Sequence, residues 1–170
     1  MNIYLVFLLT YPFVVVTHEL GHYFVARWIG AKVKEVCFGA GRTVYSWTMG
    51  ETVFKIRLFP ISGYTLMKSK KENCRRRAAR RETFSSKPAG KRILVYAAGS
   101  AANMLCAAVI WAALSCWPSL RDINTLRYVM ITFQLAGVWS LVPFLKTDGE
   151  RILELIVEGI FRRMKENRKQ

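Results

Sequence analysis

One stretch of the chain limits the possible folds more than any other feature. Residues 93–117 contain no charged side chain over 25 positions, and a helix of that length crosses a hydrocarbon layer of about 30 Å. Residues 3–29 are mostly apolar around a short polar island, and residues 128–145 are uncharged over 18 positions. We therefore predict a mainly α-helical, multi-pass membrane protein with three spans, at about 3–29, 93–117 and 128–145. The alternative, a soluble protein with buried helices, does not suit an uncharged run of this length.

The basic residues predict how these spans are oriented. The chain has 26 Lys and Arg residues against 11 Asp and Glu, a formal net charge of +15. Of the basic residues, 16 lie between positions 30 and 92, two between 118 and 127, and seven between 146 and 170. Cytosolic segments of membrane proteins carry the excess of Lys and Arg. We therefore predict that the N-terminus lies outside, and that the loop at 30–92 and the C-terminus are cytosolic.

So basic a chain could instead bind nucleic acid. The arginine cluster at 75–81 has no zinc-finger spacing and no aromatic RNA-binding signature beside it, so we expect the lipid bilayer, and no nucleic acid, as a partner. The four cysteines form no C-x-x-C pair. Cys37 and Cys74 would face the cytosol, where disulfides are rare, and we expect all four to act as small apolar residues.

The segments outside the spans differ in composition and in the secondary structure that they predict. Residues 33–67 contain short β-prone pieces separated by glycines and a proline, which predicts a small cytosolic sheet or set of hairpins. Residues 68–91 are polar and basic and suit a loop with some helix. In the tail, apolar residues recur every four positions beside basic ones. This pattern predicts an amphipathic helix at the cytosolic interface over 149–167, within one domain covering residues 1–170.

The polar island in the first span reads His18-Glu19-Leu20-Gly21-His22. Helical residues four apart lie on one face, so His18 and His22 can bind one zinc ion. Glu19 lies beside them and can act as a general base on a water molecule. Charged side chains inside a lipid-spanning helix are costly, and a bound cation offsets that cost. A helix end that turns polar groups toward water is the simpler alternative, but it does not explain the spacing.

A catalytic zinc ion generally has three protein ligands and one open position, and His18 and His22 are the only histidines. The third ligand is therefore expected to be a carboxylate or a thiolate. Asp148 follows the third span at the same cytosolic depth, and Glu150 is its competitor. Both could instead cap the tail helix, so the residues alone leave this choice open.

Beyond H-E-x-x-H, the sequence resembles the site-2 protease family of intramembrane metalloproteases along nearly its whole length. Its motifs follow in family order: Phe38-Gly39-Ala40-Gly41 resembles F-G-x-G, Pro60-Ile61-Ser62-Gly63-Tyr64 resembles P-x-G-G-Y, Ala98-Gly99-Ser100-Ala101-Ala102-Asn103 resembles A-G-P-x-x-N, and Pro143 with Asp148-Gly149 resembles the last core helix. Three positions depart from the family pattern, with Ser62 for a glycine, Ser100 for a proline and Ser140 for an asparagine. No stretch suits a PDZ or CBS domain, so the chain resembles a minimal core.

The resemblance implies an intramembrane zinc endopeptidase that hydrolyses membrane-spanning protein or peptide substrates. It implies zinc held by His18, His22 and Asp148, with Glu19 as the general base.

A helical substrate must unwind before it is cut, and the β-prone stretch 52–58 could offer it a strand edge, although an ordinary hairpin is equally plausible. We expect substrate contacts at Phe54 and Gly63, and the resemblance implies that Asn103 contacts the substrate backbone near the zinc. For Asn103 the alternative is a helix–helix contact.

Two alternative functions would be accompanied by other sequence features. A catalytically inactive membrane adaptor of the same fold would bind partners through the basic loop, and the intact H-E-x-x-H motif argues against it. Another membrane protease class, such as a prenyl-protein endopeptidase, is expected to have more spans and a glutamate as third ligand. The sequence names neither a particular substrate nor an oligomeric state.

Overall fold

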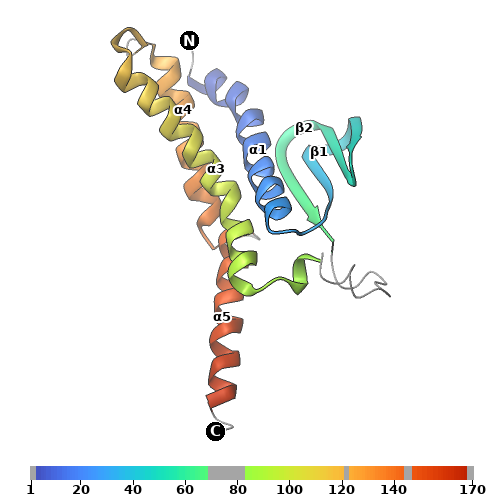
Figure 1. Ribbon diagram of the computed structural model, residues 1–170. Helices are drawn as coiled ribbons and strands as arrows, with labels where there is room; N and C mark the ends of the chain where they lie inside the picture. The colour runs from blue at the N-terminus through green and yellow to red at the C-terminus, as the bar shows by residue number, and fades with distance from the viewer. Residues whose placement is uncertain (1–2, 69–82, 121–122, 144–146, 168–170) are drawn as a thin grey trace.

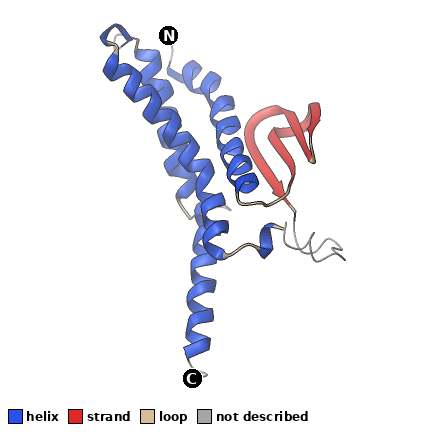
Figure 2. Cartoon of the chain, viewed as in Figure 1, coloured by secondary structure: helices blue, strands red, loops and turns tan. Residues whose placement is uncertain are grey.

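Four helices and one small sheet make up the described part of the chain (Figure 1, Figure 2). The computed structural model describes residues 3–68, 83–120, 123–143 and 147–167. The helices are α1 (Ile3–Trp28), α3 (Ala89–Cys116), α4 (Asn124–Leu141) and α5 (Asp148–Asn167), and short 3-10 turns lie at Phe84–Ser86 and Pro118–Leu120. Most of the polar loop expected at 68–91, with the arginine cluster and Cys74, lies outside the described residues. The other three cysteines are free thiols.

Two of the described helices, α1 and α3, are long and apolar enough to cross a membrane. They lie where the first two spans were predicted, although α3 already begins at Ala89. The helix α4 lies in the region predicted for the third span, but it is 18 residues long and includes Arg127. The count of three spans therefore stays a prediction.

The helices α1 and α3 approach each other closely because small residues face across the contact. A Cβ atom on Gly21 would lie 2.6 Å from the carbonyl oxygen of Ala98 and 2.8 Å from the Cβ of Ala102. At this separation position 21 accepts only glycine. Because Gly21 lies between His18 and His22, the close approach brings both histidines against α3.

The sheet is a single antiparallel hairpin of two long strands, β1 (Val33–Met49) and β2 (Thr52–Met67). Gly39 and Gly41 have φ angles of +104° and +86°, which glycine adopts without strain, and they let β1 bend back. Because both strands bend, the pairing places four segments side by side, in the order 63–67, 33–38, 52–57 and 43–49.

This pairing corrects the expected position of the open strand edge. Residues 53–56 pair with β1 on both sides, and Phe54, for example, pairs with both Val36 and Trp47. The stretch predicted to offer an edge to a substrate is therefore an inner strand, because the second half of β1 folds back along it. The outer segments of the described sheet are 43–49 and 63–67.

The sheet lies alongside α1 and not only beyond its end (Figure 1). The hydroxyl of Tyr11 donates a hydrogen bond of 3.3 Å to the carbonyl of Ile61, and Tyr11 lies about 25 Å from the C-terminal end of α1. The outward parts of the sheet carry exposed apolar side chains, among them Val44, Leu58 and Phe59. The sequence predicted a cytosolic β element, whereas this sheet reaches well along the first apolar helix.

The last helix, α5, extends away from the rest of the bundle (Figure 1). Its sequence is strongly amphipathic, and Leu155 is buried. The side chains of Leu153, Ile156, Ile160 and Met164 are exposed. The tail is therefore an amphipathic helix with an uncovered apolar face, and its place at a membrane interface stays a prediction.

Candidate metal centre

The two histidines of α1 meet on one side of the helix. Their Nε2 atoms are 3.1 Å apart, and their rings are nearly perpendicular, with centroids 4.7 Å apart. The side chain of His22 is 8% exposed and that of His18 is 18% exposed. The four-residue helical spacing thus brings two imidazoles together in a site that is largely shielded from solvent.

Asp148, the first residue of α5, joins the two histidines. Its Oδ2 lies 3.0 Å from Nε2 of His18 and 3.1 Å from Nε2 of His22. Of the two acidic candidates, it is Asp148 and not Glu150 that belongs to this group.

The start of α5 is placed by Gly149. A Cβ atom on this residue would overlap the main-chain carbonyl of Leu141 at the end of α4. Only glycine therefore lets α5 begin directly against α4, and this contact sets where the neighbouring carboxylate of Asp148 lies.

A hydrogen bond to α3 determines which nitrogen of His22 faces the centre. Its Nδ1 lies 2.7 Å from the carbonyl oxygen of Val95, which can only accept, so Nδ1 carries the hydrogen and donates it. The neutral ring then has a lone pair on Nε2, directed at Asp148 and His18. Three electron-donating atoms at separations of 3.0–3.1 Å repel one another unless a proton or a metal cation lies among them.

These separations suit zinc. Ligand atoms about 2.0–2.1 Å from a tetrahedral zinc ion lie about 3.3 Å from one another, close to the observed spacing. Two imidazoles and one carboxylate leave a fourth position open, which is typical of catalytic zinc sites. The carbonyl behind His22 is the kind of outer contact that orients a metal-binding imidazole. The residues present therefore fit a zinc ion.

The backbone of α3 forms one wall of the centre at Gly99. A Cβ atom there would lie 2.5 Å from Nε2 of His22 and 2.6 Å from Cε1 of His18. Any larger residue would have to displace both imidazoles. The A-G-x-x-x-N motif contains this glycine, but the motif alone does not reveal that it lies against the histidines.

Glu19 lies on the side of the centre that faces the sheet. Its side chain is buried, and the hydroxyl of Thr65 donates a hydrogen bond of 2.7 Å to its Oε2. A Cβ atom on Gly63 would lie 2.7 Å from Cγ and 2.8 Å from Oε1 of Glu19. The outer segment 63–67 of β2 therefore packs directly against this carboxylate.

The three expected substrate contacts lie in different surroundings. Gly63 lies against Glu19, as described above. Asn103 is 1% exposed, and its Oδ1 finds no hydrogen-bond partner among the described residues. It lies one helical turn from Gly99, and so on the same face of α3. Phe54 is packed inside the sheet, stacked on Trp47 with ring centroids 5.2 Å apart.

Two of the three departures from the family pattern contact each other. The Oγ atoms of Ser100 and Ser140 are 2.6 Å apart, which links α3 to α4. Ser62 is exposed on the sheet. Buried Ser100 and partly buried Ser140 therefore form one interhelical hydrogen bond where the family pattern has a proline and an asparagine.

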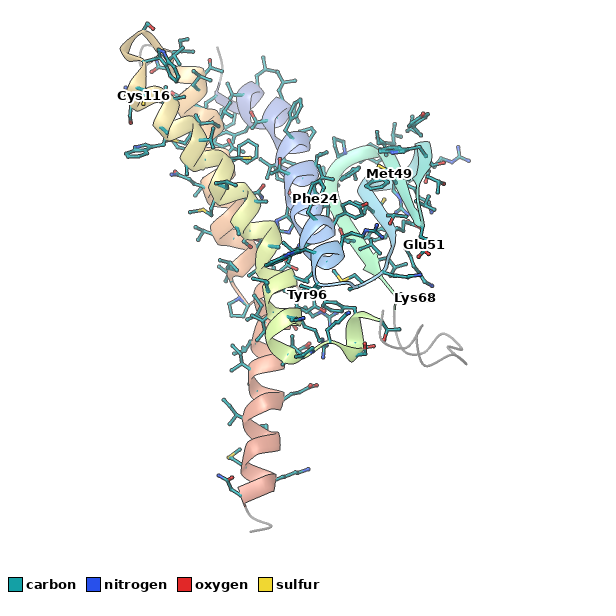
Figure 3. The ribbon with its side chains drawn as sticks, in the orientation of Figure 1. Phe24, Met49, Glu51, Lys68, Tyr96 and Cys116 are labelled. Atoms are coloured by element: carbon teal, nitrogen blue, oxygen red, sulfur yellow. The ribbon has the colours of Figure 1, made fainter. Side chains whose placement is uncertain are left out.

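A small aromatic cluster lies near the first turns of α3. Tyr96 lies beside the 3-10 turn that precedes this helix (Figure 3), with its ring edge-on to Phe84 at 5.4 Å between centroids. The guanidinium of Arg92 lies 5.5 Å from the centre of the Phe84 ring. The cluster adjoins Val95, whose carbonyl orients His22, and so ties the start of α3 into the centre.

Known proteins share the sequence around this centre. The profile of Peptidase family M50 matches residues 6–120, which is more than half of the chain. The chain belongs to the site-2 protease family. The matched region includes His18, Glu19 and His22 but ends before Asp148, so the third candidate ligand is supported by its position in the structure.

Individual relatives carry matching names. A protein of Thermotoga maritima named putative zinc metalloprotease is 36% identical over 100 residues, covering 58% of this chain and 20% of that protein. A putative zinc metalloprotease of Clostridium perfringens is 28% identical over 151 residues, covering 88% of this chain and 44% of that protein. The Regulator of sigma-E protease of Salmonella typhimurium is 31% identical over 100 residues, covering 58% of this chain and 22% of that protein.

The chain thus spans between a fifth and less than half of these relatives' lengths. Family membership and the two long apolar helices together make it an integral membrane protein. The names of the relatives indicate zinc metalloproteases, and the fold is the mostly helical one predicted, with a small two-stranded sheet.

Proposed function

We propose that this protein is an intramembrane zinc endopeptidase that hydrolyses peptide bonds of membrane-spanning substrates. One observation carries the proposal: the imidazoles of His18 and His22 and the carboxylate of Asp148 converge on one point, next to the buried carboxylate of Glu19. A zinc ion at that point would polarise the scissile carbonyl and make a water molecule more acidic.

Glu19 then serves as the general base. It accepts a proton from the attacking water and later passes a proton to the leaving amine. Its burial in the first spanning helix keeps bulk water away from the carboxylate, and its contacts with Gly63 and Thr65 keep it on the side of the centre that faces the sheet. The hydrogen bond from His22 to Val95 meanwhile prevents that imidazole from turning.

The substrate must be extended when it is cut. A membrane-spanning helix has all of its amides paired, so unwinding leaves donors and acceptors that need new partners. The outer segment 63–67 pairs with β1 on one side and lies beside Glu19, so an unwound substrate could join the sheet there. The Oδ1 of Asn103, which has no hydrogen-bond partner in the part of the chain that the structure describes, supplies one buried acceptor for a substrate amide.

The proposed arrangement in the membrane has three spans, α1, α3 and α4. The N-terminus lies outside and the basic segments lie in the cytosol, as the distribution of Lys and Arg indicates. The metal ligands of α1 lie in its C-terminal half, and Asp148 follows α4. Both therefore lie toward the cytosolic side of the membrane in this arrangement.

Cleavage of a model transmembrane substrate by the purified protein in detergent tests the proposal. We expect zinc-dependent cleavage by the wild type and a loss of at least about 1,000-fold in Glu19→Gln. Glu154→Gln, on the exposed part of α5, serves as the matched control and should retain cleavage. A wild type that binds zinc but cleaves no better than Glu19→Gln would instead support an inactive adaptor of the same fold.

A further inference from the structure

The hydroxyl of Thr65 is the side-chain group that holds the Glu19 carboxylate in the described part of the chain. It donates a hydrogen bond of 2.7 Å to Oε2 of Glu19 and lies 3.3 Å from the main-chain oxygen of the same residue. Glu19 is 5% exposed, so water has little access to replace this bond. Leaving a buried charged group without its hydrogen-bond partner costs free energy, because water does not replace the lost bond.

The alternation of β2 presents Thr65 to Glu19. Residues two apart in a strand face the same side, so Gly63 and Thr65 both face α1, while Tyr64 faces the other way. The absent side chain of Gly63 leaves the space that Glu19 fills, since a Cβ atom there would lie 2.7 Å from Cγ of Glu19. Position 63 therefore makes room for the carboxylate, and position 65 binds it.

Contacts on the opposite side of the strand keep it in this register. The hydroxyl of Tyr64 donates a hydrogen bond of 2.6 Å to Oε1 of Glu35, and Lys55 donates one of 2.7 Å to Oε2 of the same residue. Arg57 in turn donates a hydrogen bond of 2.9 Å to the Tyr64 hydroxyl. A slip by one residue would turn Tyr64 toward Glu19, and these three contacts oppose it.

We propose that Thr65 is a positioning residue that aims the carboxylate of Glu19 at the reacting water. The geometry of the general base is then set by the sheet as well as by α1. Glutamate has three rotatable side-chain bonds, and a catalytic group needs a defined direction to act efficiently. This inference rests on the proposed function, because it requires Glu19 to act as the base.

Two substitutions separate the hydroxyl from the shape of the side chain. Thr65→Val removes the hydroxyl and keeps the volume, whereas Thr65→Ser keeps the hydroxyl. For the full chain in detergent, cleaving a model transmembrane substrate, we expect Thr65→Val to lower kcat about 10- to 100-fold. KM should change by less than about twofold, and the zinc content should not change. Thr65→Ser should recover most of the lost kcat.

Thr48→Val is the matched control, since Thr48 is an exposed threonine in β1, and it should leave kcat unchanged. Equal losses of kcat in Thr65→Val and Thr65→Ser would indicate packing and overturn the proposal. An unchanged kcat in Thr65→Val, or a loss of zinc in that variant, would also overturn it.

A second readout does not depend on catalysis. The Tm of the wild type, Thr65→Val, Glu19→Gln and the double variant form a double-mutant cycle. We expect the decrease in Tm of the double variant to be smaller than the sum of the decreases in the two single variants. Thr65→Val removes a hydrogen bond that Glu19→Gln already changes. A wild type that cleaves nothing contradicts the proposed function, whatever the cycle shows. A wild type that cleaves, with additive changes of Tm, contradicts only the role of Thr65.

Discussion

At the scale of single residues, the centre depends on glycines as much as on the groups that bind metal. A Cβ atom on Gly99 would come within 2.6 Å of both imidazoles, and one on Gly149 would overlap the end of α4. A side chain at position 99 would displace the imidazoles, and one at position 149 would move the start of α5 and with it Asp148. The arrangement of the ligands is therefore sensitive to the smallest possible substitution at these sites.

We expect Gly99→Ala to weaken zinc binding about 10- to 100-fold, the range found for changes just outside a set of metal ligands. Gly90→Ala is the control, because position 90 lies on the same helix and a Cβ atom there would have no neighbour within 4 Å among the described residues. Zinc titration against a competing chelator measures both. Equal zinc affinities in the two variants would contradict the close contact between α3 and the histidines.

The residues of the site differ in how far the sequence reveals them. His18, Glu19 and His22 lie within one and a half turns of a helix, so a local spacing identifies them. Asp148 lies 126 residues from His22, and no local pattern connects the two. Its place after the third predicted span, together with the resemblance to a family, pointed to Asp148 before the structure did. The contact of Thr65 with Glu19 has no sequence signal, because it arises when a distant strand packs against α1.

At the scale of the elements, the helices followed from apolar length, whereas the sheet edge did not. A run of uncharged residues determines a spanning helix almost by itself. A strand edge depends on which segments pair, and here the bend at Gly39 and Gly41 lets β1 cover both sides of residues 53–56. The β-prone stretch was identified, but its inner position was not.

The hydrogen bond between Ser100 and Ser140 predicts a coupling between α3 and α4. Ser140 also lies 3.1 Å from the carbonyl oxygen of Gly137 and donates to it, which leaves its oxygen to accept from Ser100. We expect Ser100→Ala to lower the free energy of unfolding by about 0.5–1.5 kcal/mol. Adding Ser140→Ala should cost little more. Unfolding in mixed detergent measures both, and full additivity would rule out the bond.

The cluster around Glu35 predicts that the sheet is sensitive to acid. The hydrogen bond from Lys55, followed by that from Tyr64, holds the pKa of Glu35 below its ordinary value of 4.5. A lowered pKa in the folded state stabilises the protein above the ordinary value, and this stabilisation is lost as pH falls. We expect the wild type to have a higher Tm than Glu35→Gln at pH 6, and this difference to shrink as the pH falls below 4.5. A difference in Tm between the two proteins that does not change with pH would contradict a lowered pKa of Glu35.

At the scale of the whole molecule, the main prediction is how the helices are arranged in the membrane. The structure contains two helices that qualify as spans, and the third, α4, ends at Leu141, shortly before Asp148. If α4 spans the membrane, it returns the chain to the side on which His18 and His22 lie. A shared metal site for α1 and α5 requires that return, so the topology and the chemistry depend on each other.

Reporter fusions test this arrangement. A reporter after Leu120 should lie outside the cell, and one after Gln170 should lie in the cytosol, because α4 would cross the membrane between them. Both reporters on one side would show that α4 does not span. The basic segments would then lie on opposite sides of the membrane, or α3 would not span either.

The central claim is that His18, His22 and Asp148 hold one metal ion. The most direct measurement is the zinc content of the purified wild type, His22→Ala, Asp148→Ala and Glu150→Ala after identical dialysis. We predict about one zinc per chain in the wild type and in Glu150→Ala, and a large loss in the other two variants. Full zinc in Asp148→Ala together with its loss in Glu150→Ala would contradict the account.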